Sequence, residues 1–215
     1  MDSKLRIVRR GTDPQDDRWF SKEAILKLQK AQEELEWLLN RGYNNKSLMN
    51  MIGNHYQFSV RQRNALTRST SSKEKRNNRK EKCVTLASCK NNCIYIDGFN
   101  LIITLEVALS EGILVLCNDG TMRDLAGLRG TYSVIDKTDL ALNLIGKELN
   151  NTDISKVEIF LELKQQVDSF LYTKERVVTS DSIILDNCKS WLNLGRKIIE
   201  DYVYDRNIVD LGGKI

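Results

Sequence analysis

Cys93-Ile-Tyr-Ile-Asp-Gly-Phe-Asn100 is the stretch that decides the fold of this chain of 215 residues. Its first four residues form a short apolar run, typical of a buried strand, and this run ends abruptly at Asp97 and Gly98. From Leu101 to Leu109 the apolar residues recur at helical spacing. A strand followed at once by a helix is the repeating unit of an α/β sheet.

The same alternation continues toward the C-terminal end of the chain. Further strands are predicted at residues 113–117, 157–161, 176–179 and 208–211, and further helices at residues 137–149, 182–194 and 196–204. Strands that alternate with helices favour a mainly parallel sheet with helices on both of its faces. Residues 83–215 are therefore predicted to form a three-layer α/β/α domain.

Residues 1–82 show only helical patterns. An amphipathic helix is predicted from Ser21 to Leu39, a short second helix ends near Gly53, and Ser59 with Gln62 forms a capping box for a third. We therefore predict a small all-helical N-terminal domain that ends in a linker or an exposed helix end over residues 69–82. The three helices could form a helix-turn-helix, or a helical hairpin that packs on the second domain.

Formal charge divides the chain in the same place. Residues 1–82 carry 19 Lys and Arg against 10 Asp and Glu, whereas residues 83–215 carry 14 against 19. A basic segment attracts polyanions, so nucleic acid is the predicted partner. The candidate phosphate contacts are Arg61, Arg63, Lys75, Arg76 and Arg79. The alternative is that these cations are only solvated.

Cysteine, histidine and apolar residues limit the possible classes of protein. The five cysteines are odd in number and lack a tight Cys-x-x-Cys pair, which favours free thiols over a disulfide framework or a zinc site. His55 is the only histidine and lies in a helical pattern, which disfavours a histidine-dependent nucleophile. Because the chain has neither an apolar run long enough for a membrane nor a signal segment, we expect a cytoplasmic protein without a membrane partner.

Acidic residues follow several of the predicted strands. Asp97 and Asp181 come directly after two of them, and Asp119 follows a third with one residue between; Asp124 and Asp139 lie on segments that lead away from the same edge. If these strands are neighbours, their carboxylates converge and require a hard divalent cation. Mg²⁺ or Mn²⁺ is the predicted cofactor, for metal-assisted phosphoryl transfer. Alternatively, each Asp is only a helix N-cap, above all Asp181.

Two of these elements resemble a known superfamily. Asp97-Gly-Phe-Asn100 and Val178-Thr-Ser-Asp181, each at the end of a strand, resemble the best-marked elements of the PIN and NYN nucleases. The whole chain also resembles an uncharacterised prokaryotic family with a helical domain of unknown function and a PIN-like domain. The further matching stretches are Arg41-Gly-Tyr43, Gly53-Asn-His-Tyr56, Arg61-Gln-Arg63 and Asn118-Asp-Gly-Thr-Met-Arg-Asp-Leu-Ala126.

The resemblance implies a metal-dependent ribonuclease, so RNA is expected before DNA. Asp97 and Asp181 match the first and last acidic positions of the superfamily, and Asp119, Asp124 and Asp139 are candidates for the middle ones. Asp124 and Asp119 are preferred, and Asp97, Asp124 and Asp181 form the expected catalytic set. The residues implied for substrate binding are Asn100, Thr179, Ser180, Arg123 and Arg129.

One departure from the superfamily bears on activity. Only residues 162–175 separate the third strand from the fourth, which barely permits a helical crossover and removes room for a ligand loop. Glu162 is a possible substitute ligand. The alternative function is therefore a non-catalytic nucleic-acid-binding protein on a decayed PIN-like scaffold. A phosphatase or a nucleotide-binding regulator ranks third, because no glycine-rich phosphate loop occurs in the sequence.

Overall fold

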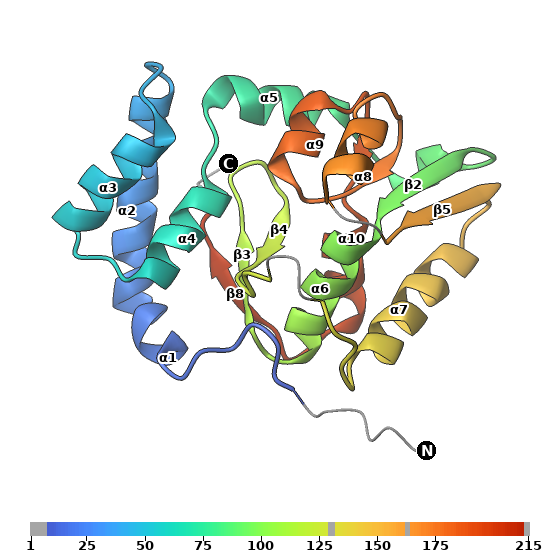
Figure 1. Ribbon diagram of the computed structural model, residues 1–215, viewed down its shortest axis with the longest axis horizontal. Coiled ribbons are helices and arrows are strands. Elements are labelled where there is room, and N and C mark those ends of the chain that lie inside the picture. Colours follow the sequence, from blue (N-terminus) through green and yellow to red (C-terminus); the bar gives the residue numbers. More distant parts are fainter. Residues whose placement is uncertain (1–7, 129–131, 162–163, 213–215) are drawn as a thin grey trace.

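The computed structural model describes residues 8–128, 132–161 and 164–212, with the side chains of residues 164–167 excepted (Figure 1). The α-helices are α1 Asp16–Trp19, α2 Lys22–Leu39, α3 Asn45–His55, α4 Val60–Ser69, α5 Lys73–Lys82, α6 Gly98–Leu109, α7 Thr138–Asn150, α8 Lys164–Leu171, α9 Ser182–Asn187 and α10 Leu194–Tyr202. The strands are β1 Cys83–Val84, β2 Cys93–Asp97, β3 Ile113–Leu116, β4 Met122–Asp124, β5 Lys156–Phe160, β6 Val177–Val178, β7 Trp191–Leu192 and β8 Asn207–Asp210. The predicted α/β class is confirmed.

The strands lie in two sheets. The larger sheet has the order β1-β7-β6-β2-β5, and every neighbouring pair in it is parallel. The smaller sheet has the order β4-β3-β8, in which β3 is parallel to β8 and antiparallel to β4. The ends of β2 and β6 are therefore neighbours, whereas the strand before Asp119 belongs to the other sheet.

The structure differs from the predicted pattern at residues 182–194 and in the connection after β5, and the short strands β1 and β4 were not predicted. Residues 182–194, predicted as one helix, form the short helix α9 and the strand β7, because Trp191 and Leu192 are buried within the larger sheet. The short connection after β5 nevertheless contains a helix, α8. The crossover that the length of this connection placed in doubt is therefore present.

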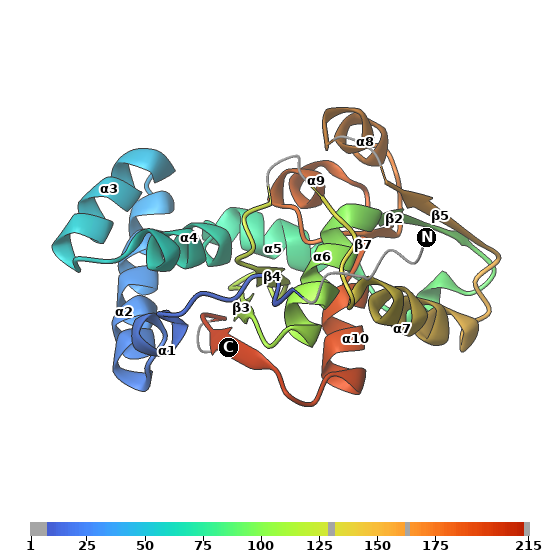
Figure 2. The same ribbon diagram turned by 60° about the horizontal axis from the view of Figure 1, so that its bottom comes forward.

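The first helices share their core with the smaller sheet. Leu28 and Leu35 of α2 and Leu66 of α4 belong to the same buried apolar cluster as Val115 of β3 and Val209 of β8. Figures 1 and 2 both place α2 and α3 at one end of the molecule and β2, β5 and α7 at the other, with β3 between. Of the two predicted helical arrangements, the structure has the one in which the helices pack on the second part of the chain.

The basic stretch before β1 is helical over most of its length. Ser72 is the N-cap of α5 and its Oγ accepts a hydrogen bond from the Lys75 amide. One side chain of this polar helix, Arg79, is only 3% exposed. The stretch is therefore a packed element and not a solvated linker. Within the described residues, no helix has the length and apolar character needed to cross a membrane.

The predicted capping box of α4 is present and provides a test of local stability. The Ser59 hydroxyl accepts a hydrogen bond from the Gln62 amide, and the Gln62 side chain accepts one from the Ser59 amide. Ser59→Ala is expected to lower the free energy of unfolding by about 1 kcal/mol in urea denaturation. Ser47→Ala, at an exposed position of α3, is the control and should change it by less than about 0.5 kcal/mol. Equal values for both variants would contradict the role of the capping box.

Candidate functional site

Asp97 lies at the carboxyl end of β2, beside the end of β6. Its Oδ2 accepts a hydrogen bond from the Thr179 hydroxyl at 2.9 Å. Burial raises the pKa of Asp97 to about 6, with further contributions from the negative charges of Asp181 and Asp168, while the Thr179 bond opposes the shift. A carboxyl group with this pKa exchanges its proton close to neutral pH.

Asn100 joins the two strand ends. Its side-chain oxygen accepts hydrogen bonds from both the amide and the hydroxyl of Ser180, each at 2.9 Å. The Asp181 amide in turn donates to the Thr179 hydroxyl at 3.0 Å. The Asp97–Asn100 and Thr179–Asp181 elements are therefore in direct contact.

Asp181 also begins α9. Its Oδ1 accepts hydrogen bonds from the Ile183 amide at 2.8 Å and the Ile184 amide at 3.4 Å. This is the N-cap role that the sequence suggested as an alternative. This role uses Oδ1 of the carboxylate.

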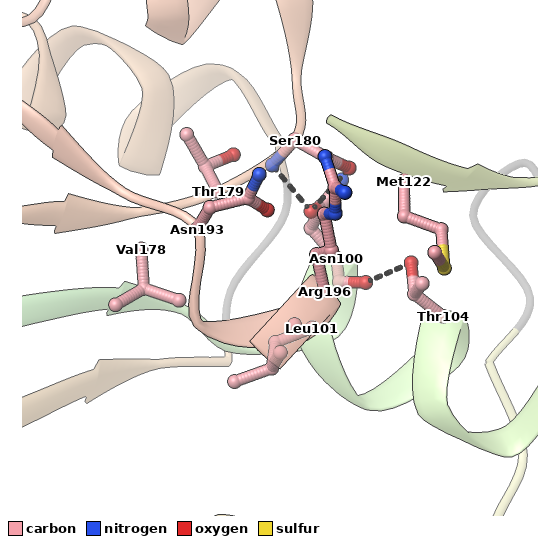
Figure 3. A pocket seen from close by; sticks show the side chains of 10 residues that line it. Asn100, Leu101, Thr104, Met122, Val178, Thr179, Ser180, Asn193 and Arg196 are labelled. Atoms are coloured by element: carbon pink, nitrogen blue, oxygen red, sulfur yellow. Dashed lines mark hydrogen bonds between the residues drawn. The ribbon is translucent and has the colours of Figure 1, made fainter. Parts of the chain in front are cut away.

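A small pocket opens beside this junction (Figure 3). Its volume of about 10 Å³ is close to what a single water molecule needs. The polar side chains that line it are those of Asn100, Thr104, Thr179, Ser180, Asn193 and Arg196. Arg196 of α10 is 34% exposed and its guanidinium donates to the Gly120 carbonyl and to Glu200. The hydroxyl protons of Thr104, Thr179 and Ser180 are donated within the protein. The side-chain amides and the Arg196 guanidinium are therefore the lining groups that suit a phosphate oxygen.

Sequence reasoning missed Asn193, Arg196 and Asp168. Asn193 and Arg196 follow β7, a strand of two residues that was predicted as part of a helix, so nothing marked them as strand-end residues. Asp168 lies on α8, within the connection that the sequence treated only as short. Recognition of the Trp191–Leu192 strand was the available signal for the first two.

Asp124 lies behind the pocket. Its Oδ2 accepts a hydrogen bond from Thr104 at 3.3 Å, and its Oδ1 accepts one from the Ala126 amide at 2.8 Å. Arg68 is 3.7 Å from the same Oδ1. Asp124 is 8% exposed, so it reaches the pocket through Thr104 and does not face it openly.

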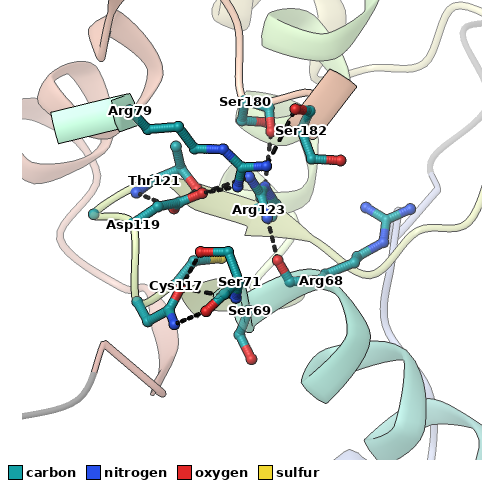
Figure 4. A network of polar contacts seen from close by, with 12 residues as sticks. Arg68, Ser69, Ser71, Arg79, Cys117, Asp119, Thr121, Arg123, Ser180 and Ser182 are labelled. Carbon is teal, nitrogen blue, oxygen red and sulfur yellow. Dashed lines mark hydrogen bonds and ion pairs between the residues drawn. The ribbon is translucent and has the colours of Figure 1, made fainter. Parts of the chain in front are cut away.

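Asp119 is not part of the Asp97 group. Its Oδ2 is 2.7 Å from Arg79 and 2.9 Å from Arg123, and its Oδ1 accepts two hydrogen bonds from Thr121 (Figure 4). Burial on its own would raise the pKa of Asp119, but Arg123, Thr121 and Arg79 lower it, and the net shift is downward. This carboxylate is neutralised by arginine within the fold.

The other predicted residues lie apart from this junction. Asp139 is exposed in the first turn of α7, and Arg129 and Glu162 lie outside the described residues. The predicted phosphate contacts have partners inside the protein: Arg61 pairs with Asp16, Arg63 donates to Phe58 and Asn54, Lys75 pairs with Asp186, Arg76 with Glu36, and Arg79 with Asp119 and Asp186. These cations are not arranged as an open phosphate-binding surface.

The donors near Asp97 agree with a divalent cation only in part. Among the described residues, no group of three His, Cys, Asp or Glu side chains could hold a metal ion. Asp97 and Asp181 nevertheless lie at adjacent strand ends, and the charge of Asp181 acts on Asp97. Mg²⁺ commonly binds through one or two carboxylates, with water and substrate phosphates as its other ligands. The oxygen donors present suit such an ion, but not a closed site built from protein ligands alone.

Comparison with known proteins gives a family without a described activity. A model described as a protein of unknown function (DUF434) matches residues 27–82, and one described as a domain of unknown function (DUF5616) matches residues 86–164 and 161–197. An uncharacterized protein of Methanocaldococcus jannaschii is 30% identical to this chain, and the match covers 81% of the chain and 98% of the relative. No solved structure matches the chain.

Proposed function

We propose that this chain, which belongs to the family described by the DUF434 and DUF5616 models, is a metal-dependent nuclease that cleaves RNA at the junction of Asp97 and Asp181. The single observation that carries the proposal is the pair of carboxylates at the end of β2 and after β6, two adjacent strands, beside a small pocket lined in part by polar side chains. The relationship to the PIN and NYN nucleases and action in the cytoplasm are parts of this proposal.

Electrostatics at Asp97 favour a cationic ligand. Burial already disfavours its ionised form, and the charges of Asp181 and Asp168 disfavour it further, so a bound cation would relieve both effects. Asp97 and Asp181 are the residues that would hold Mg²⁺ or Mn²⁺. The bound ion would lower the pKa of a water molecule and offset negative charge on the phosphate.

The surrounding side chains have separate roles in this proposal. Asn100 and Thr179 hold the two strand ends together, which keeps the distance between the two aspartates constant. Arg196 and Asn193, which also line the pocket, would contact an oxygen of the substrate phosphate. Arg61, Arg76 and Arg79 of α4 and α5 are paired within the protein, so this proposal places the contact with the cleaved phosphate near the pocket.

Asp181→Asn tests the proposal without removing the cap of α9, because Asn is as good an N-cap as Asp. The wild-type protein is expected to cleave a mixed-sequence single-stranded RNA in the presence of Mn²⁺. Asp181→Asn should lower the rate at least about 100-fold, because a carboxylate ligand of the ion is lost. Cleavage is followed on denaturing gels, and Mn²⁺ binding by calorimetry.

Asp153→Asn is the matched control, since Asp153 is exposed and paired only with Lys90. It should cleave at the wild-type rate. Equal cleavage by Asp181→Asn and the wild type would refute this site. RNA binding without cleavage, independent of metal and steeply dependent on salt, would select the non-catalytic alternative.

A further inference from the structure

Two arginines hold the chain on both sides of Asp181. The Arg123 Nε donates to the Ser180 carbonyl at 2.7 Å, and an Arg79 guanidinium nitrogen donates to the Ser182 carbonyl at 3.2 Å. Both guanidinium groups also contact the same atom, Oδ2 of Asp119. The Asp119 carboxylate therefore fixes the orientation of Arg79 and Arg123. These two arginines in turn hydrogen-bond the backbone of residues 180 and 182 (Figure 4).

Burial makes this arrangement rigid. Arg79 is 3% exposed, Arg123 is 8% exposed and Asp119 is 3% exposed, so water competes little for their hydrogen bonds. Arg79 is fixed further by the Asp186 carboxylate at 2.7 Å and by the Trp191 indole, which donates to the Arg79 carbonyl at 2.6 Å. A planar guanidinium with several partners has one orientation, and the single ammonium group of lysine can replace only some of these contacts.

The three residues come from distant parts of the chain. Arg79 lies on α5, Asp119 in the turn after β3, and Arg123 on β4. Arg79 belongs to the segment matched by the first family model, whereas Asp119, Arg123 and Asp181 belong to the segment matched by the second. The contacts therefore join the two matched parts of the protein at Asp181.

We propose that Arg79, Asp119 and Arg123 are positioning residues that hold Asp181 at the functional junction, so that the N-terminal helices complete the site and do not act as a separate nucleic-acid-binding module. This inference rests on the proposed function for the role of Asp181. It gives the two matched segments a physical reason to occur together: the site is incomplete without α5.

Hydrogen exchange and Mn²⁺ binding in the full-length chain test the inference. Arg79→Met removes the guanidinium and keeps an apolar stem. Arg76→Met is the control on the same helix, because the ion pair of Arg76 is with Glu36 and not with the segment of residues 180–182. In Arg79→Met, amide exchange over residues 180–186 should become at least about tenfold faster, while that over β2 stays unchanged. The Mn²⁺ affinity of Arg79→Met should be about tenfold weaker than that of the wild type. Arg79→Lys should have an affinity between those of Arg79→Met and the wild type.

Results of two kinds, in exchange and in Mn²⁺ affinity, would overturn the inference. One is unchanged exchange over residues 180–186 in Arg79→Met, or an equal increase in Arg76→Met. The other is unchanged Mn²⁺ affinity in Arg79→Met despite faster exchange, because the contact would then be structural alone. If the wild type binds no Mn²⁺, the proposed function fails while the exchange data still decide whether Arg79 fixes the segment.

A second variant covers the case in which Arg79→Met does not fold. Asp186 is 23% exposed in its pair with Arg79, so Asp186→Asn removes the negative charge from one partner of that arginine with less disturbance of the core. It should accelerate exchange over residues 180–186 in the same direction and to a smaller extent. No change in exchange would count against the inference.

Discussion

Replacing Asp119 by alanine is expected to lower the free energy of unfolding by about 3–5 kcal/mol. The change leaves two buried guanidinium groups, those of Arg79 and Arg123, without their shared carboxylate. It also removes both hydrogen bonds from Thr121. Chemical denaturation at neutral pH in the presence of EDTA measures the loss.

This result separates the two roles that Asp119 could have. A metal ligand surrounded by other carboxylates relieves repulsion when it is removed from the metal-free protein, so its loss costs little or stabilises the fold. Removal of a carboxylate that lies between two buried arginines instead destabilises the fold. Asp139→Ala is the control, because Asp139 is exposed in the first turn of α7, and it should cost less than about 1 kcal/mol. A loss below about 1 kcal/mol for Asp119→Ala would contradict the structural role.

Local patterns in the sequence predicted much of the fold. The strand and helix on either side of Asp97 and the capping box at Ser59 depend on neighbours within a few residues, so periodicity and capping rules were sufficient. The elements around Asp97 and Asp181 were expected to meet if their strands were neighbours, and β2 and β6 are adjacent. The contact between Asn100 and Ser180 that joins them was not predicted.

Long-range pairing could not be predicted in the same way. The sequence contains no signal that assigns β3 to a second sheet, and this assignment separates Asp119 from Asp97. Arg79 meets Asp119 across 40 positions of the chain, and nothing local distinguishes Arg79 from the other cations of α5. The composition of a basic stretch shows its charge. Which of its side chains become buried depends on the element that packs over them.

Asp97→Asn is expected to abolish the proposed cleavage and, at the same time, to stabilise the protein by about 3 kcal/mol at pH 8. The amide resembles the protonated carboxyl, which burial and the charges of Asp181 and Asp168 favour. Because the folded pKa of about 6 exceeds the value near 3.8 of an ordinary Asp, the wild type loses stability as the pH rises between these values. Below about pH 4 the carboxyl is protonated in both the folded and the unfolded state.

The pH dependence of this difference identifies its cause. The variant and the wild type should unfold with nearly equal free energies at pH 4, differ progressively up to about pH 6, and keep a constant difference above about pH 7. Urea denaturation in EDTA across this range measures it, and Asp153→Asn should follow the wild type at every pH. A difference independent of pH would point to altered packing. A variant less stable than the wild type at pH 8 would contradict an electrostatic cost at Asp97.

Greater stability together with lost cleavage is the combination expected of a carboxylate retained for its charge, because such a group stabilises a bound ion and not the fold.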